Sequence, residues 1–524
     1  MKGVVSAGHE LTAKTAVEML EMGGNAFDAA VAATFSSFVC EPALTGIGGG
    51  GFFMGHTKDN KTVVYDFFPD MPGKGGKRTD ELHFYPISMD FTDTVQEFHV
   101  GKGAAAVPGS LAGLSQVYEV HCTLPLPTLL SPAISYARNG IVLNKQQAYF
   151  NSILGAILTA SEEGRTIYAP HGKLLKEGER LFNPDMANTL EFLATEGLHA
   201  FYEGDWLASI VDAFGEGGFI TEEDLSTYSA RVRSPLEVDY HGRKVYTNPP
   251  PSSGGCLIAF SLKLLETYNL ASMPHNSCAY LKLLFDVMTV TNEARGADFN
   301  HRVYDEDLVH HFLSNDTLSR YRDKVKESTQ PSLMPDVSGT GNTTHLSIID
   351  NEGNAASVTT SNGEGCGYFI PGTGIMLNNM LGEEDINPHG FHSHEPGMRL
   401  SSMMAPTIVM KDMRPELVLG SGGSNRIRNA ILQVILNVID HGLPVNEAVN
   451  APRCHWDGET FHAEKGINKD ELDDLKIHNV SIKNWSQQNM YFGGVHTAVS
   501  HNSGKLLSGA GDARRGGVCL KSDG

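Results

Sequence analysis

Thr343 stands at the start of a strand-like stretch, a position at which a threonine can act as a nucleophile. Residues 341–350 read GNTTHLSIID, and their side chains alternate in character as in a β-strand. If the bond between Asn342 and Thr343 is cut, Thr343 gains a free α-amine beside its own hydroxyl. An α-amine has an ordinary pKa of about 7.7–8.0, so near neutral pH it accepts the hydroxyl proton. Thr343 would then carry both nucleophile and base, which is N-terminal threonine catalysis.

The element that must position Thr343 is a hairpin. The turn-forming residues NEGN (351–354) follow the first strand, and residues 355–360 predict the returning strand. The shorter register places Ser361 opposite Thr343, and a loop one residue longer places Asn362 there. In either register a small polar side chain lies beside the Thr343 hydroxyl.

A second stretch predicts an anion-binding bend. Strand-like residues 404–410 and 416–419 precede GSGGSN (420–425), and a buried helix follows. Free backbone N–H groups and the positive end of a helix converge at such a bend. The glycine spacing does not match a dinucleotide-binding fingerprint, and an oxyanion hole for acyl transfer fits as well or better. A plain tight connection is the alternative.

Other patterns indicate structure rather than chemistry. The glycine block 48–51 lacks a following Gly-Lys-Ser/Thr and leads into an apolar strand, so we expect close backbone packing there and no phosphate loop. His389, His392 and His394 lie in a Gly/Pro-bounded loop without supporting carboxylates or cysteines, so we expect no metal site. Periodicity predicts helices over 12–22, 26–38 and 256–265, and strands over 61–68 and 491–499.

Composition bounds the class of protein. The chain has 524 residues, 41% of them hydrophobic, which is enough for more than one domain or one large layered unit. Its formal net charge of −21 argues against nucleic acid and anionic membranes as partners. The seven scattered cysteines predict neither a disulfide framework nor a zinc ribbon. We see no secretory leader and no apolar run of membrane-spanning length, so we expect a cytoplasmic protein.

Short motifs occur in order along nearly the whole chain: GGNA (23–26), the glycine block 48–51, VPG (107–109), PPSSGG (250–255), TTH (343–345), NN (378–379), LSSM (400–403) and GG (422–423). Together they resemble the γ-glutamyltranspeptidase family of N-terminal nucleophile hydrolases. The resemblance implies an α+β fold, a four-layer αββα sandwich. It also implies cleavage between Asn342 and Thr343, so that residues 1–342 and 343–524 become two fragments of one intertwined unit.

The resemblance assigns roles to residues of this chain. Thr343 matches the nucleophile, and Ser361 matches a second threonine that bonds it. Gly422 and Gly423 match the glycines that stabilise the oxyanion. The substrate-binding candidates are Ser401 and Ser402 for the α-carboxylate end, Glu383 for the α-amine with Glu384 as its one-residue alternative, and Asn362.

The chain departs from the family where a γ-glutamyl group is held. The family reads Asp-Phe-Arg-Glu near residue 66, and its arginine pairs with the α-carboxylate. Here Phe68 takes the place of that bidentate cation. Asn362-Gly363 replaces Leu-Asn, and Met380 replaces a polar residue. Arg399 and Arg426 are candidates for the missing charge.

We therefore expect a self-cleaving enzyme that hydrolyses or transfers the acyl group of γ-glutamyl or related amides, as in glutathione metabolism, with no metal or organic cofactor. The same chemistry on poly-γ-glutamate, or on an acyl amide lacking a free α-carboxylate, is the alternative. A non-catalytic, unprocessed relative is the alternative of another class. The expected partners are the small amide substrate, an acceptor amine or water, and the two cleavage fragments with each other. A homo-oligomer is compatible with the sequence.

Overall fold

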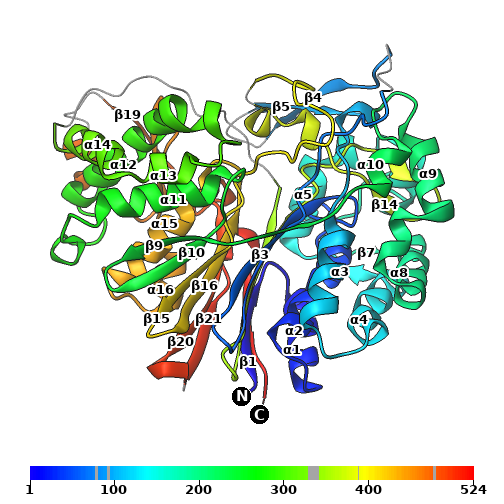
Figure 1. Ribbon diagram of the computed structural model, residues 1–524, viewed down its shortest axis with the longest axis horizontal. Coiled ribbons are helices and arrows are strands. Elements are labelled where there is room, and N and C mark those ends of the chain that lie inside the picture. Colours follow the sequence, from blue (N-terminus) through cyan, green and yellow to red (C-terminus); the bar gives the residue numbers. More distant parts are fainter. Residues whose placement is uncertain are drawn as a thin grey trace.

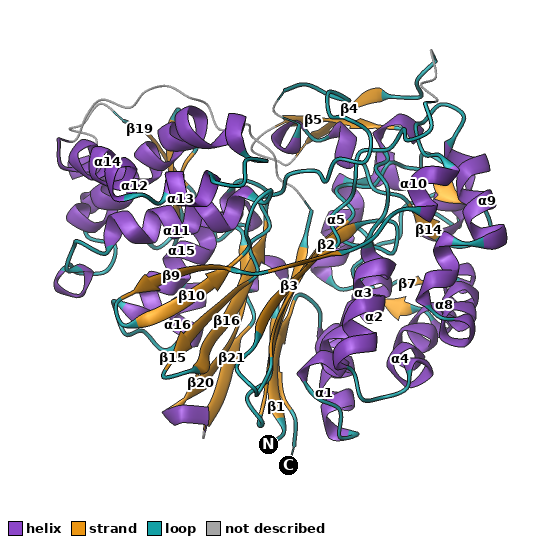
Figure 2. Ribbon diagram, viewed as in Figure 1, coloured by secondary structure: helices purple, strands orange, loops and turns teal. Residues whose placement is uncertain are grey.

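Two β-sheets lie face to face at the centre of the computed structural model, and helices cover both outer faces (Figures 1 and 2). The structure describes residues 1–76, 81–90, 95–327, 342–387, 389–475, 480–504 and 506–523. The loop expected over 330–341 lies outside these ranges. The arrangement confirms the four-layer αββα sandwich.

Both sheets combine strands from before and after Thr343. The first has the order β22-β1-β11-β12-β2-β3-β8, and the second has the order β21-β20-β16-β15-β10-β9. In the first sheet the strands span Val518–Lys521, Gly3–Ala7, Thr344–Asp350, Ala355–Ser361, Gly50–His56, Thr62–Asp66 and Arg231–Arg233. In the second they span Leu506–Ala510, Gly494–His501, Arg414–Gly422, Thr407–Lys411, Arg243–Thr247 and Leu236–Tyr240.

Each sheet has its own helical cover. Helices α1 (Glu10–Glu21) and α2 (Ala26–Cys40) pack on the first sheet, and α11 (Ser253–Leu265) and α15 (Arg426–Ile439) pack on the second. The outer helices include α3 (Ser110–His121), α4 (Leu126–Asn139), α5 (Lys145–Ile153), α8 (Pro184–Glu196), α9 (Gly204–Phe214), α12 (Cys278–Ala294), α14 (Asn315–Glu327) and α16 (Val445–Asn450). Figure 1 shows the two chain ends side by side at one end of the sandwich, because β1 pairs with β22.

Strand β11 is buried on both faces because it lies between a helical layer and the second sheet. Leu346 and Ile348 join the core formed with α2. On the other face the Ser347 hydroxyl donates to the carbonyl of His496 in β20 at 2.9 Å. The alternation of apolar and polar side chains in the sequence thus separates a helix-facing side from a sheet-facing side.

The expected hairpin is confirmed in its shorter register. Thr344 pairs with Thr360, and the Asp350 N–H donates to the Asn354 carbonyl at 3.0 Å. Extended by one residue, this register would place Thr343 opposite Ser361.

Element ends differ modestly from the expected ones. Strand β16 extends to Gly422 because residues 420–422 pair with 494–496 of β20, so the glycine bend is shorter than the sequence suggested. The glycine block provides close packing as expected, since a Cβ at Gly49 or Gly51 would collide with a carbonyl of the adjacent strand. No helix in the described ranges has both the length and the apolar character that crossing a bilayer requires.

Candidate active site

Thr343 lies just before β11 and is 5% exposed. Its carbonyl accepts a hydrogen bond from Nη1 of Arg515 at 3.3 Å. The backbone of Gly422 packs against the same carbonyl so closely that a Cβ on Gly422 would collide with its oxygen. The end of β16 therefore lies directly against the residue that the sequence predicts to be the nucleophile.

The Ser361 side chain forms a hydrogen bond with the peptide group that precedes Thr343. Its hydroxyl donates to the carbonyl oxygen of Asn342 at 2.5 Å and accepts from the N–H of Gly363 at 2.9 Å. Asn342 and Ser361 are 1% and 3% exposed, so this polarised carbonyl lies in a desolvated site. A donor on a carbonyl oxygen stabilises negative charge that develops there when the carbon is attacked.

The glycine bend joins β16 to α15. Gly423 has φ +125° and Ser424 has φ +52°, and the first residue of α15 is Arg426. A left-handed backbone at Gly423 suits a residue without a Cβ. The bend thus joins the end of β16, which packs against Thr343, to the start of α15, where free N–H groups carry partial positive charge.

Two glutamates lie near this site: Glu364 contacts Asn342, and Glu383 lies beside Gly363. Glu364 is 1% exposed and accepts hydrogen bonds from the side chain of Asn379 at 3.2 Å and from the backbone N–H of Asn342. Burial raises the pKa of Glu364 to about 7, and Asp385 acts in the same direction. Burial, followed by the charges of Glu364 and Asp385, raises the pKa of Glu383 well above its ordinary value.

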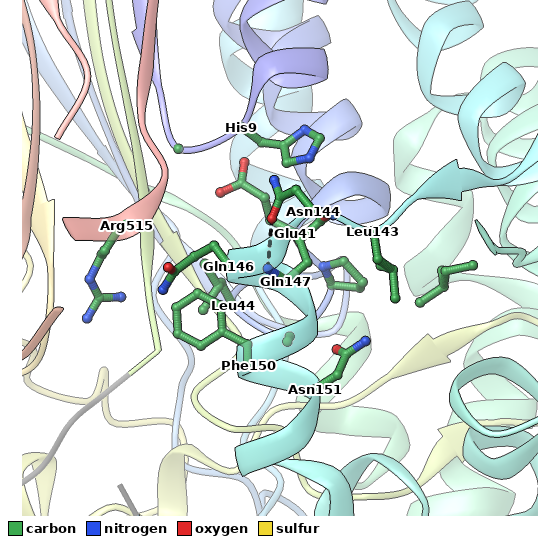
Figure 3. A pocket seen from close by; sticks show the side chains of 14 residues that line it. His9, Glu41, Leu44, Leu143, Asn144, Gln146, Gln147, Phe150, Asn151 and Arg515 are labelled. Carbon is green, nitrogen blue, oxygen red and sulfur yellow. Dashed lines mark hydrogen bonds between the residues drawn. The ribbon is translucent and has the colours of Figure 1, made fainter. Parts of the chain in front are cut away.

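A third buried glutamate lies under the start of β11. Glu41 accepts hydrogen bonds from the hydroxyls of Thr344 at 2.6 Å and Thr12 at 2.9 Å, and burial raises its pKa to about 7. Glu41 also lines a cavity with Gln147 and Arg515. Figure 3 shows Arg515 at one end of this cavity, apart from Glu41 and Gln147. The cavity therefore reaches from the guanidinium that holds Thr343 to the carboxyl that holds Thr344.

The remaining candidates lie in different surroundings. The hydroxyl of Ser401 donates to the Pro251 carbonyl at 2.8 Å, and that of Ser402 accepts from the Met404 N–H at 3.2 Å, so both bond to backbone. The amide of Asn362 donates to the Met376 carbonyl at 3.2 Å. Glu384 is exposed, whereas the Oε1 atom of Glu383 is buried.

At Phe68, the position for which the family resemblance implied an arginine, apolar side chains pack closely. Phe68 is 1% exposed and stacks on Phe52 with a centroid distance of 5.6 Å. Arg399 does not supply the missing charge, because its guanidinium is buried in ion pairs with Asp66 at 2.7 Å and Asp70 at 2.6 Å. Arg426 is also buried, and its guanidinium lies 4.9 Å from the centre of the Tyr491 ring.

The family model described as gamma-glutamyltranspeptidase matches residues 12–522. The chain belongs to the γ-glutamyltranspeptidase family. The match covers every strand of both sheets except β1, and every residue of the site described above. It confirms the resemblance on which the site assignments rest.

Relatives within and around the family carry two kinds of name. The chain is 30% identical over 553 residues to a glutathione hydrolase proenzyme of Bacillus subtilis (strain 168), covering 99% of this chain and 91% of that protein. It is 32% identical over 471 residues to the acylase ACY 1 proenzyme of Pseudomonas sp. (strain SE83), covering 89% and 84%. The solved structure of a cephalosporin acylase from Bacillus halodurans has the same fold, with a TM-score of 0.85 at 24% identity and coverage of 100% and 96%.

Three residues around Thr343 in this γ-glutamyltranspeptidase-family chain were not singled out from the sequence. Glu364 had a local signal, since it is a lone acid between two glycines directly after the returning strand. Arg515 lies in a Gly/Arg-rich stretch near the chain end, but nothing local links it to Thr343, 172 residues away. Glu41 follows a long apolar helix, and only the fold brings it to Thr344.

Proposed function

We propose that this γ-glutamyltranspeptidase-family chain is a self-cleaving N-terminal threonine enzyme that hydrolyses or transfers the acyl group of γ-glutamyl or related amides. The observation that carries the proposal is the Asn342 carbonyl, whose oxygen accepts the Ser361 hydroxyl at 2.5 Å while the next residue, Thr343, lies against Gly422. These contacts suit attack of a neighbouring hydroxyl on that carbonyl.

Self-cleavage would begin when the Thr343 hydroxyl oxygen attacks the carbonyl carbon of Asn342. The C–N bond breaks, the nitrogen takes the hydroxyl proton, and the Asn342 acyl group becomes an ester on Thr343. Water then hydrolyses the ester, leaving a carboxylate on Asn342 and a free α-amine on Thr343. The fragments 1–342 and 343–524 would stay together because each sheet contains hydrogen-bonded strands from both.

In the mature enzyme the α-amine of Thr343 would accept the proton of its own hydroxyl as the oxygen attacks a substrate amide. The tetrahedral oxyanion would lie at the Gly422–Gly423 bend, where backbone N–H groups and the positive end of α15 converge. The α-amine returns its proton to the leaving amine, and the acyl group stays on Thr343 as an ester. Water or an acceptor amine then takes the acyl group.

A second part of the proposal concerns the identity of the acyl donor. Relatives named glutathione hydrolase and acylase are similar to this chain to about the same degree, 30% and 32%. Apolar packing at Phe68 favours acyl groups that need no arginine there. Poly-γ-glutamate and amides without a free α-carboxylate are therefore substrates to compare with γ-glutamyl amides. Substrate contacts by Ser401, Ser402, Asn362 and Glu384, a cytoplasmic location and homo-oligomer formation remain predictions.

Acyl trapping tests the nucleophile directly. The mature protein is mixed with a γ-glutamyl or acyl anilide, quenched in acid within one turnover, and digested for mass spectrometry. We expect the added acyl mass on the peptide that begins with Thr343, and none in Thr343→Ala. An acyl group on another residue would overturn the proposal.

A further inference from the structure

Arg515 is a buried cation that forms no ion pair with an acid in the part of the chain that the structure describes. It is 4% exposed, its guanidinium donates to the Thr343 carbonyl at 3.3 Å, and its Nε atom finds no acceptor among the described residues. The acid nearest to it in sequence, Asp512, pairs instead with Arg453 at 2.7 Å and with Arg514 at 3.1 Å. A buried charge without a counter-ion is costly. The position of Arg515 beside Thr343 therefore points to a role in the reaction rather than in stability.

Three glycines hold the guanidinium in place at the ends of β16 and β20. A Cβ on Gly422 would lie 3.1 Å from Nη1 of Arg515, and a Cβ on Gly423 would lie 3.3 Å from Nη2. A Cβ on Gly494, which pairs with Gly422, would collide with the Cδ atom of Arg515. Larger residues at these positions would push the side chain away. The glycines thus fix a positive charge next to Thr343.

Arg515 keeps its charge at neutral pH. Burial, followed by the charge of Arg426, lowers its pKa to about 10, which is still well above neutrality. Arg426 begins α15 at the same bend and adds to the positive charge there. Asp385, which accepts a hydrogen bond from the Ser424 hydroxyl at the bend, opposes it.

The other titratable groups around the start of β11 are largely uncharged in mildly acidic solution. Burial raises the pKa of Glu41 and of Glu364 to about 7, and it raises the pKa of Glu383 well above its ordinary value. Burial also lowers the pKa of His496 to about 4 and that of His345 well below its ordinary value. Below about pH 7 these groups therefore add little charge to oppose the guanidinium.

The charge of Arg515 acts on the amine that self-cleavage creates. Within one residue the backbone nitrogen lies about 3 Å from the carbonyl oxygen, so a guanidinium bonded to the Thr343 oxygen lies about 6 Å from the nitrogen. At an effective dielectric constant of about 20, a positive charge at that distance lowers the pKa of an amine by about two units. An ordinary α-amine, with a pKa of about 7.7–8.0, is mostly protonated at pH 7 and cannot then accept the hydroxyl proton.

We propose that the guanidinium of Arg515 keeps the α-amine of mature Thr343 in its unprotonated, proton-accepting form near neutral pH. Arg515 is a positioning residue in this role, because it acts on the reaction through the amine and not on the substrate. The inference rests on the proposed function, in which this amine is the base, and adds the group that sets its protonation state.

Carbamoylation by cyanate tests the proposal without substrate turnover. Cyanate reacts with the unprotonated amine, so the rate at which the peptide beginning with Thr343 gains the carbamoyl mass, followed against pH, gives the titration midpoint of the amine. We expect a wild-type midpoint of about 6 and a midpoint at least about one pH unit higher in Arg515→Gln. Arg515→Lys is the matched control because it keeps the charge, and it should shift the midpoint by less than half as much.

Two results would overturn the proposal. One is a wild-type midpoint at or above the ordinary value of about 7.7–8.0, which needs no variant to be measured. The other is a midpoint in a folded, cleaved Arg515→Gln that lies within about 0.3 unit of the wild type. Arg515→Met, which is uncharged and also long, replaces Arg515→Gln if that variant fails to fold or to cleave itself.

The pH profile of kcat/KM separates a charge effect from a structural one. The acid limb of the profile reports the base in the free enzyme, so it should move up in Arg515→Gln by the same amount as the cyanate midpoint. A purely structural contact would lower kcat/KM at every pH and leave the limb in place, which would refute the proposed role. The same substrate is used throughout, so its own titration cancels in the comparison.

Failure of this inference and failure of the proposed function give different results. If the midpoint does not depend on Arg515 but an acyl group is trapped on Thr343, only the role of Arg515 is refuted. If the chain stays uncut, so that no peptide beginning with Thr343 can be carbamoylated, the proposed function itself is refuted.

Discussion

Ser361→Ala is predicted to slow self-cleavage by about 10²–10³-fold, the usual effect of removing one donor from an oxyanion site. The prediction follows from the 2.5 Å hydrogen bond between the Ser361 hydroxyl and the Asn342 carbonyl oxygen. Because both residues are at most 3% exposed, water is not expected to replace the lost donor. In free energy the loss is about 3–4 kcal/mol in the transition state.

The same substitution has a smaller cost in stability. The Gly363 N–H, which donates to the Ser361 hydroxyl at 2.9 Å, would lose its acceptor. An unpaired buried donor costs about 1–3 kcal/mol, so the variant should fold with a lower melting temperature. Ser361→Thr is the matched control, because it keeps the hydroxyl and should cleave within about tenfold of the wild type.

A pulse-chase assay measures the rate before cleavage is complete. The chain is labelled briefly during cell-free synthesis, and the uncut fraction is followed on a denaturing gel. Circular dichroism of purified Ser361→Ala confirms that it is folded. Cleavage of a folded Ser361→Ala at a rate within threefold of the wild type would refute the role of this hydroxyl.

Further predictions concern the bend, the apolar wall and a buried acid. Gly422→Ala should stop self-cleavage in a chain that still folds, because its Cβ would collide with the Thr343 carbonyl oxygen; normal cleavage on a gel would contradict this. Phe68→Arg should lower the melting temperature, because the charge would be buried against Phe52. It should hydrolyse γ-glutamyl amides no faster than Phe68→Leu, and a gain in that activity would show that an arginine at this position can still bind the α-carboxylate. The pKa of Glu41 is raised by burial from 4.5 to about 7, so the folded state binds more protons than the unfolded state in this window. The free energy of unfolding should therefore fall by up to about 3 kcal/mol as the pH rises through the window, and less in Glu41→Gln. Urea unfolding at pH 5 and pH 8 measures this change in the free energy of unfolding for the wild type and for Glu41→Gln. An equal change in the two proteins would exclude the contribution of Glu41.

Local signals were enough for the hairpin. The NEGN turn and the alternation after Thr343 depend on neighbours in sequence, so the hairpin was predictable. The sequence left two registers open, and the structure has the shorter one, which pairs Thr344 with Thr360. The αββα layering was not derivable from periodicity. It followed from the resemblance, because strands such as β1 and β11 pair across more than 300 residues.

The rest of the site depends on contacts that only the fold creates. Glu364 meets Asn342 after the left-handed turn at Gly363. Arg515 meets Thr343 because its side chain packs on Gly494, which pairs with Gly422 across β20 and β16. For Arg399 the sequence suggested a role in substrate binding that its contacts in the fold do not support. A candidate cation in the sequence proved to be held in buried ion pairs with acids of the first sheet and the loop after it.

Mass spectrometry of the intact protein tests the central claim most directly. The account predicts two chains, 1–342 and 343–524, with the second beginning Thr-Thr-His, and a single full-length chain for Thr343→Ala. A wild-type protein that stays uncut after long incubation, or a Thr343→Ala variant that is cut at the same bond, would contradict it.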